Sequence, residues 1–240
     1  MKIAILYSGT IRNLNETINN NIDCFNYGDI DLYFSIWDHI GYSDRINSPD
    51  YIMSNRILDK DTKITEDIIR NIVPQNINIK AIKIEKYNPD DYMLDLINGT
   101  DNPGLHAQYY KILDCFNLLD DSENYDFIVR LRCDLFLQEK ISKEYIMECN
   151  NQIIFPSKIW YDYCWTAERS SINEMMWISN KELMKKVCNI YNNGDKINSI
   201  ICNKNMTDPN YGESICFMNL MAENIAGNIK TFDFNYLVLR

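Results

Sequence analysis

The sequence lacks the features of several classes of protein. It contains no dense run of lysine or arginine, and its 34 acidic residues outnumber its 24 basic residues to give a net charge of −10. Binding to nucleic acid depends on summed positive charge, so nucleic acid is not an expected partner. No stretch approaches the roughly 18 apolar residues of a membrane span, and the apolar start at residues 1–7 is too short for a signal peptide. These absences predict a soluble, cytoplasmic protein.

Two common cofactor patterns are also missing. The eight cysteines are scattered without any C-x-x-C pair, so we expect reduced thiols rather than a zinc or redox site. The Gly-x-Gly-x-x-Gly pattern is absent, which disfavours a nicotinamide or flavin dinucleotide. Because the chain has neither an internal repeat nor a low-complexity linker, we expect residues 1–240 to form one domain.

The chain does contain alternating strand and helix patterns. Residue 65 is a predicted helix N-cap, and Ser179 to Glu182 form a predicted capping box. Alternation of this kind predicts an α/β, Rossmann-like fold, with a mostly parallel sheet covered by helices on both faces. Apolar runs predict strands near 2–7, 31–38, 77–87, 125–135, 152–155 and 174–178. Helical spacing predicts helices near 14–25, 65–73 and 102–120, and from 181 and 209 onwards.

Polar residues follow the first two predicted strands. In an open parallel sheet, ligands bind outside the carboxyl ends of the strands. Ser8 and Gly9 would allow the backbone to approach a ligand, and Arg12 would hold a phosphate with its forked donors. The alternative is a plain turn with a surface arginine. Asp38 lies at the end of the second strand and is a further candidate nucleotide-binding residue.

A second polar group, Arg130, Arg132 and Asp134, ends the buried strand that starts near residue 125. Buried strands rarely end in two arginines without partners for them. The functional hypothesis is a diphosphate held by arginine and by a magnesium or manganese ion that Asp134 ligates. The alternative is a structural salt bridge. Because Arg12 and Asp134 are both assigned to the diphosphate, we expect them to face the same cleft.

Two carboxylates in the second half are candidate catalytic bases. Glu213 follows Asp208 and Pro209 at the start of a predicted helix, where the helix dipole alone favours an acid. Asp162 lies in the aromatic segment 160–165, which is either a platform for a sugar ring or part of the core.

Five segments together carry a resemblance to a known family. They are Leu6–Arg12, Phe34–Asp38, Gln108–Lys111, Tyr125–Leu135 and Tyr211–Ser214. In order and spacing they resemble glycosyltransferases of bacterial polysaccharide clusters and large DNA viruses, which are similar to GT-A enzymes. The resemblance implies a GT-A-like fold, a nucleotide-sugar donor, a glycan acceptor and a divalent metal bound by an Asp-x-Asp-type motif.

The metal motif of that family is incomplete in this chain. Asp134 would stand at its last acid, while Arg132 occupies the position of the first aspartate. The metal would then be held by Asp134 with phosphate oxygens, or the arginines would replace it altogether. The resemblance also implies that Tyr7 to Arg12 line the nucleotide site, with Lys111 nearby on its helix.

Three hypotheses follow for function. The leading one is a glycosyltransferase, in which Glu213 or Asp162 deprotonates an acceptor hydroxyl that attacks the anomeric carbon while cationic groups stabilise the departing diphosphate. The second is a sugar-phosphate nucleotidyltransferase, although Ile11 interrupts the Gly-Thr-Arg triplet of that class. The third is a non-catalytic module that binds a nucleotide or carbohydrate, which the solitary Asp134 favours.

Overall fold

The structure is a computed structural model, and it describes residues 1–41, 62–92, 103–148, 150–156, 174–203, 212–233 and 235–239. The strands are β1 (Lys2–Gly9), β2 (Asp29–Trp37), β3 (Asn78–Glu85), β4 (Phe127–Leu131), β5 (Leu135–Leu137), β6 (Ile153–Pro156), β7 (Met176–Ser179), β8 (Ile229–Phe232) and β9 (Tyr236–Val238). The α-helices are α1 (Leu14–Cys24), α2 (Glu66–Ile72), α3 (Pro103–Phe116), α4 (Lys143–Glu148), α5 (Lys181–Cys188), α6 (Gly194–Asn203) and α7 (Gly212–Ala222). Short 3₁₀ helices span Pro89–Tyr92, Asn189–Asn193 and Ala226–Asn228.

Seven strands form one sheet in the order β3-β2-β1-β4-β7-β6-β8. β1 pairs in parallel with β2 and with β4, and β2 pairs in parallel with β3. β7 runs antiparallel to both β4 and β6, and β8 is parallel to β6. The predicted α/β fold with a mostly parallel sheet is therefore confirmed, including the parallel pairing of the first strand with the strand that contains Arg130.

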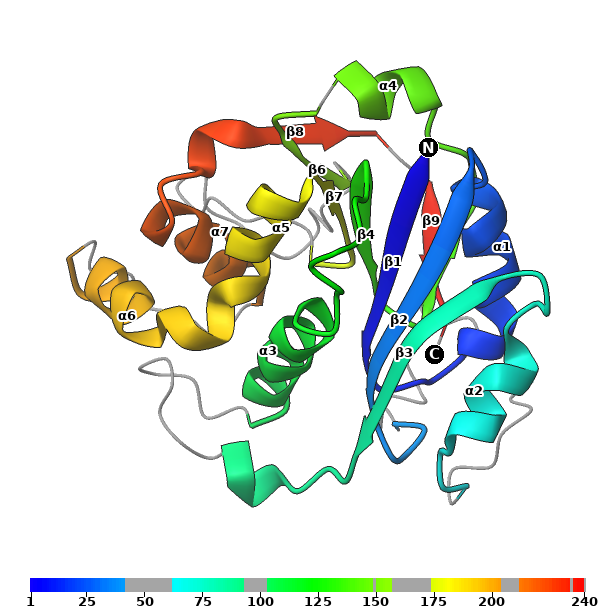
Figure 1. Cartoon of the computed structure of the whole chain (residues 1–240). Coiled ribbons are helices and arrows are strands. Elements are labelled where there is room, and N and C mark those ends of the chain that lie inside the picture. Colours follow the sequence, from blue (N-terminus) through cyan, green and yellow to red (C-terminus); the bar gives the residue numbers. More distant parts are fainter. Residues whose placement is uncertain are drawn as a thin grey trace.

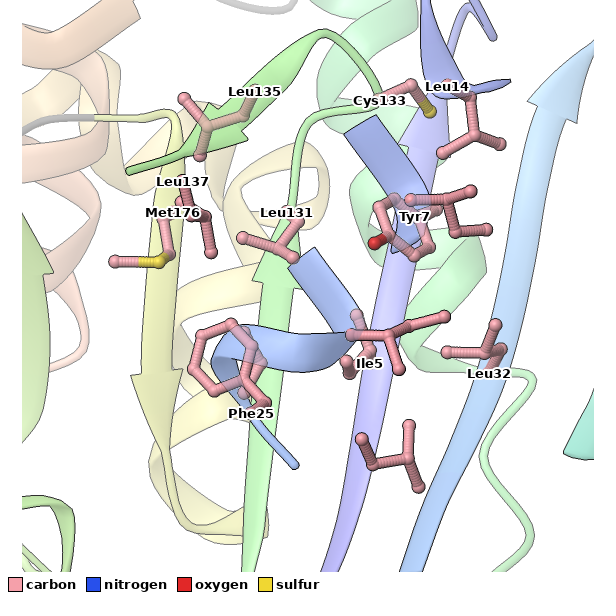
Figure 2. Close-up of a cluster of buried hydrophobic side chains, with 14 of the residues drawn as sticks. Ile5, Tyr7, Leu14, Phe25, Leu32, Leu131, Cys133, Leu135, Leu137 and Met176 are labelled. Atoms are coloured by element: carbon pink, nitrogen blue, oxygen red, sulfur yellow. The ribbon is translucent and has the colours of Figure 1, made fainter. Parts of the chain in front are cut away.

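Helices cover both faces of the sheet, as predicted (Figure 1). Successive strand residues point to opposite faces, so Ile5 packs with α1 and α2 while Leu6 packs with α3, α5, α6 and α7. Figure 2 shows the first of these two cores, to which Ile5, Leu14 and Leu131 belong. The central parallel strands β1, β2 and β4 are buried on both faces, which explains why their sequences are largely continuous apolar runs.

Two details of the strand and helix ends differ from the predictions. β4 ends at Leu131, so the prediction that the strand continues through Arg132 was wrong: residues 132–135 form a turn in which the Leu135 N–H donates to the Arg132 carbonyl at 3.3 Å. The N-cap of α5 is Asn180 and not Ser179, because the Asn180 side chain accepts from the Leu183 N–H at 3.0 Å. The predicted cap at Thr65 is confirmed, since its hydroxyl accepts from the Ile68 N–H at 3.5 Å.

The apolar helices of this fold are short. Across the part of the chain that the structure describes, no helix has both the length and the hydrophobicity that crossing a bilayer requires.

Candidate functional site

A cavity of about 250 Å³ opens at the carboxyl ends of β1 and β4. The topology of the sheet predicts a ligand site at this edge. Five segments of the chain contribute to its wall: the loop after β1, the end of β2, the segment after β3, the first turns of α3 and the turn after β4. The residues are Ser8, Gly9, Thr10, Arg12, Trp37, His39, Gly41, Tyr87, Gly104, Ala107, Gln108, Arg130, Arg132, Cys133 and Asp134.

The loop after β1 has a backbone that few residue types adopt. Gly9 has a φ of +101° and Arg12 has a φ of +41°. A residue other than glycine adopts such a conformation at a cost on the order of 1 kcal/mol, and such residues concentrate at ligand sites. A hydrogen bond and close packing both fix the loop. The Arg12 N–H donates to the Ile40 carbonyl at 2.8 Å, and the backbone of Gly41 lies so close to Thr10 that a Cβ on Gly41 would be 2.5 Å from the Thr10 Cβ.

Arg12 and Arg132 both bind the carboxylate of Asp134. Arg132 binds it with two hydrogen bonds, from Nε to Oδ1 at 2.9 Å and from Nη2 to Oδ2 at 2.8 Å. Arg12 donates from Nη1 to Oδ2 at 2.5 Å. The expectation that Arg12 faces the same cleft as Asp134 is therefore confirmed, although 122 positions separate the two residues.

The two guanidinium groups set the charge state of Asp134, which is buried. Burial alone would raise the pKa of this carboxyl, but the charges and hydrogen bonds of Arg132 and Arg12 outweigh that effect and hold the pKa well below its ordinary value. Asp134 is therefore ionised throughout the physiological pH range.

This arrangement does not fit a divalent cation. A carboxylate offers about four lone-pair positions, and arginine N–H groups occupy three of them here. A magnesium ion would have to approach an Asp134 oxygen to about 2.1 Å. Guanidinium nitrogens already lie 2.5 to 2.9 Å from both of these oxygens, so their positive charges would repel the ion. Among the described residues, no group of three His, Cys, Asp or Glu side chains could hold a metal ion. The described donors thus disagree with the predicted role of Asp134 as a metal ligand.

Arg130 adds a third guanidinium to the cavity wall. It is buried, its Nη1 donates to the backbone carbonyl of Glu174, and its guanidinium lies 4.8 Å from the ring centroid of Trp177. Its Nε and Nη2 have no hydrogen-bond partner among the described residues. Burial lowers the pKa of this guanidinium, and the nearby Glu174 carboxylate partly opposes the shift. An unpaired buried donor is costly, so these groups favour a ligand that supplies acceptors.

Three other predicted nucleotide-binding residues do not line this cavity. The Tyr7 ring stacks on Phe34 with a centroid distance of 5.4 Å and lies in the core shown in Figure 2. Lys111 is fully buried and donates to Glu85 at 2.5 Å. Asp38 accepts from the Tyr87 N–H at 3.4 Å.

The predicted catalytic residues lie outside the described side chains. Glu213 belongs to the first turn of α7, but its side chain is not among the described ones. Asp162 lies in the segment 157–173, outside the described residues. Their roles as bases stay predictions.

Several residues of the wall were not predicted. Trp37 and Tyr87 provide aromatic surface at the ends of β2 and β3, with ring centroids 5.2 Å apart. Gln108 donates to the Glu174 carboxylate at 3.0 Å, and that carboxylate lies 3.6 Å from Arg132. The sequence did contain one indication of the role of Trp37, because this residue directly precedes Asp38 at a predicted strand end. Glu174 gave no sequence signal.

Comparison with known proteins supports the fold. No protein-family model matches the chain, and no curated protein sequence matches it. Among solved structures, the chain is similar to the galactosyltransferase LgtC in complex with donor and acceptor sugar analogs, with a TM-score of 0.54 and 9% sequence identity over 96% of this chain and 73% of LgtC. An active-site mutant of LgtC matches equally well, with a TM-score of 0.54 and 10% identity over 96% and 72% of the two chains. At this identity the likeness shows the fold alone, an α/β fold of the GT-A-like type.

Proposed function

We propose that this chain is a glycosyltransferase that transfers a sugar from a nucleotide-sugar donor to an acceptor hydroxyl. The observation that carries the proposal is the convergence of Arg12, Arg130 and Arg132 on one cavity at the carboxyl ends of β1 and β4. Guanidinium groups are well suited to bind a diphosphate. The shared fold with a galactosyltransferase supports the same reaction class. We further propose that residues 1–240 form one domain.

In this proposal the diphosphate of the donor lies against the guanidinium groups, and Ser8 and Gly9 allow the backbone to approach it. Transfer breaks the bond between the anomeric carbon and the diphosphate oxygen and forms a bond to the acceptor oxygen. The positive groups stabilise the charge that develops on the leaving diphosphate. The acceptor proton passes to a carboxylate base, for which Glu213 and Asp162 stay the candidates.

Release of nucleoside diphosphate from sugar nucleotides tests the proposal. We expect the protein to release UDP or GDP from at least one of UDP-glucose, UDP-galactose and GDP-mannose, slowly with water as acceptor and faster with a glycan acceptor. If it binds these donors without releasing the diphosphate, it is a binding module. If it forms pyrophosphate from a nucleoside triphosphate and a sugar 1-phosphate, it is a nucleotidyltransferase.

A further inference from the structure

The cavity wall carries more positive than negative charge. Its described side chains include three guanidinium groups, and the carboxylate of Asp134 is the only negative group among them. The carboxylate of Glu174, 3.6 Å from Arg132, still leaves an excess of one positive charge among these five groups. The whole chain has a net charge of −10, so this positive site is a local feature and not a consequence of overall composition.

The arginines are also held in place before any ligand binds. Asp134 fixes the side chains of Arg12 and Arg132 through three hydrogen bonds. The Glu174 backbone carbonyl and the Trp177 ring fix Arg130, whose Nε and Nη2 are left without partners in the described part of the chain. Groups fixed in this way lose little side-chain entropy when an anion binds.

The first turns of α3 add to the positive potential. Gly104, Ala107 and Gln108 of this 14-residue helix line the same cavity. The amino end of a helix carries a partial positive charge that favours anions. The cavity therefore combines a helix amino end with guanidinium groups, and the one carboxylate among the described residues of its wall is already occupied by arginine.

From this arrangement we infer that the chain binds the diphosphate of its donor without a divalent cation, with Arg12, Arg130 and Arg132 supplying the positive charge. The inference rests on the proposed function and specifies how its donor site works. Asp134 orients two of the arginines and does not ligate a metal ion.

Calorimetric titration of the full chain with UDP, GDP, ADP and thymidine diphosphate tests the inference, once in EDTA and once in manganese chloride. We expect at least one diphosphate to bind in EDTA, with a dissociation constant within about threefold of the value in manganese. Arg12→Gln should weaken that binding by tenfold to a hundredfold, as expected for loss of a charge-assisted hydrogen bond. Arg12→Lys should retain part of the affinity, since it keeps the charge and loses the fork.

A matched control is Arg70→Gln, which should leave the affinity unchanged. Arg70 lies on α2, and its ion-pair partner among the described residues is the exposed Glu66. Binding that requires manganese overturns the inference and leaves the proposed function standing. Binding in EDTA that Arg12→Gln does not weaken also overturns the inference, since the diphosphate then lies elsewhere. If none of the four diphosphates binds in either condition, the inference and the proposed function both fall. Because Arg12 is partly exposed, its variants should fold, and their circular dichroism spectra verify this.

Discussion

Two clusters of charged side chains differ in charge balance: one lies between β3 and α3, and the other lies at the carboxyl ends of β1 and β4. The lysine cluster consists of Lys83, Glu85, Lys111 and Asp114, with Lys111 2.5 Å from Glu85 and Lys83 2.6 Å from Asp114. Two positive charges meet two negative charges. The arginine cluster consists of Arg12, Arg130, Arg132 and Asp134. Three positive charges meet one negative charge there, or two when the Glu174 carboxylate at 3.6 Å from Arg132 is included.

The two clusters also differ in their position relative to the cavity. No member of the lysine cluster lines the cavity, whereas all four members of the arginine cluster do. In the lysine cluster Ser35 adds a hydrogen bond to Asp114 at 2.5 Å and accepts one from Lys111 at 3.2 Å, so its charges are satisfied within the protein. The lysine cluster is thus satisfied within the protein, whereas the arginine cluster leaves excess positive charge at the cavity, where the proposed diphosphate would bind.

The largest effect is expected in the lysine cluster. Lys111→Met removes the fully buried cation and leaves the carboxylates of Glu85 and Asp114 undercompensated. Breaking a buried ion pair on one side should lower the free energy of unfolding by about 3 kcal/mol. Urea denaturation measures the loss. Binding of UDP or GDP by the folded variant should change less than threefold. A loss of affinity larger than that caused by Arg132→Gln would return Lys111 to the nucleotide site and would end the contrast between the clusters.

The second effect is expected in the arginine cluster and concerns binding. Arg132→Gln removes a guanidinium from the cavity wall while Arg12 still pairs with Asp134. We expect the dissociation constant of the bound nucleoside diphosphate to rise about thirtyfold, which corresponds to about 2 kcal/mol. Isothermal titration calorimetry measures it. An unchanged affinity with a large loss of stability would make this cluster structural, as the lysine cluster is.

The third effect appears in acid. The arginines hold the pKa of Asp134 below its ordinary value of 3.8, so this group contributes stability that is present above pH 3.8 and is lost as the pH falls through the folded pKa. Asp134→Asn should remove that contribution. Below pH 3.8 the wild type should lose stability more steeply than the variant, by at most about 1.4 kcal/mol per pH unit. Urea denaturation at pH 5 and pH 3 measures the slopes. Equal slopes would mean that the arginines do not act on Asp134.

The sequence predicts the half of the fold that depends on local patterns. β1 and β4 are continuous apolar runs, and their shared edge predicts that Arg12 and Asp134 face one cleft. The antiparallel direction of β7 is harder to predict from sequence, because strand direction depends on the connection and not on the residues of Met176–Ser179. The pairing of β5 with β9 joins Leu135–Leu137 to a segment about a hundred residues away, and no local pattern encodes that contact.

The site also divides into features that local sequence predicts and features that depend on tertiary packing. A polar cluster at the end of β4 is visible in the sequence, but its internal pairing depends on the turn at 132–135, which folds Arg132 back onto Asp134. Glu174 meets Gln108 and Arg132 only through tertiary packing. The family resemblance implies that Lys111 lies near the nucleotide, yet its side chain pairs with Glu85 at 2.5 Å and does not line the cavity.

The smallest effect separates burial from charge within the lysine cluster. Lys83 contacts the same two carboxylates as Lys111, at 2.6 Å from Asp114 and 3.4 Å from Glu85, but its side chain is 37% exposed whereas that of Lys111 is 0% exposed. Water and salt screen an exposed pair, so Lys83→Met should lower the free energy of unfolding by only about 0.5 to 1 kcal/mol. Most of that loss should disappear in 1 M sodium chloride, whereas the loss from Lys111→Met should persist. Urea denaturation of both variants at low and high salt measures the difference. Equal losses with equal salt dependence would mean that charge balance alone, without burial, determines the stability of this cluster.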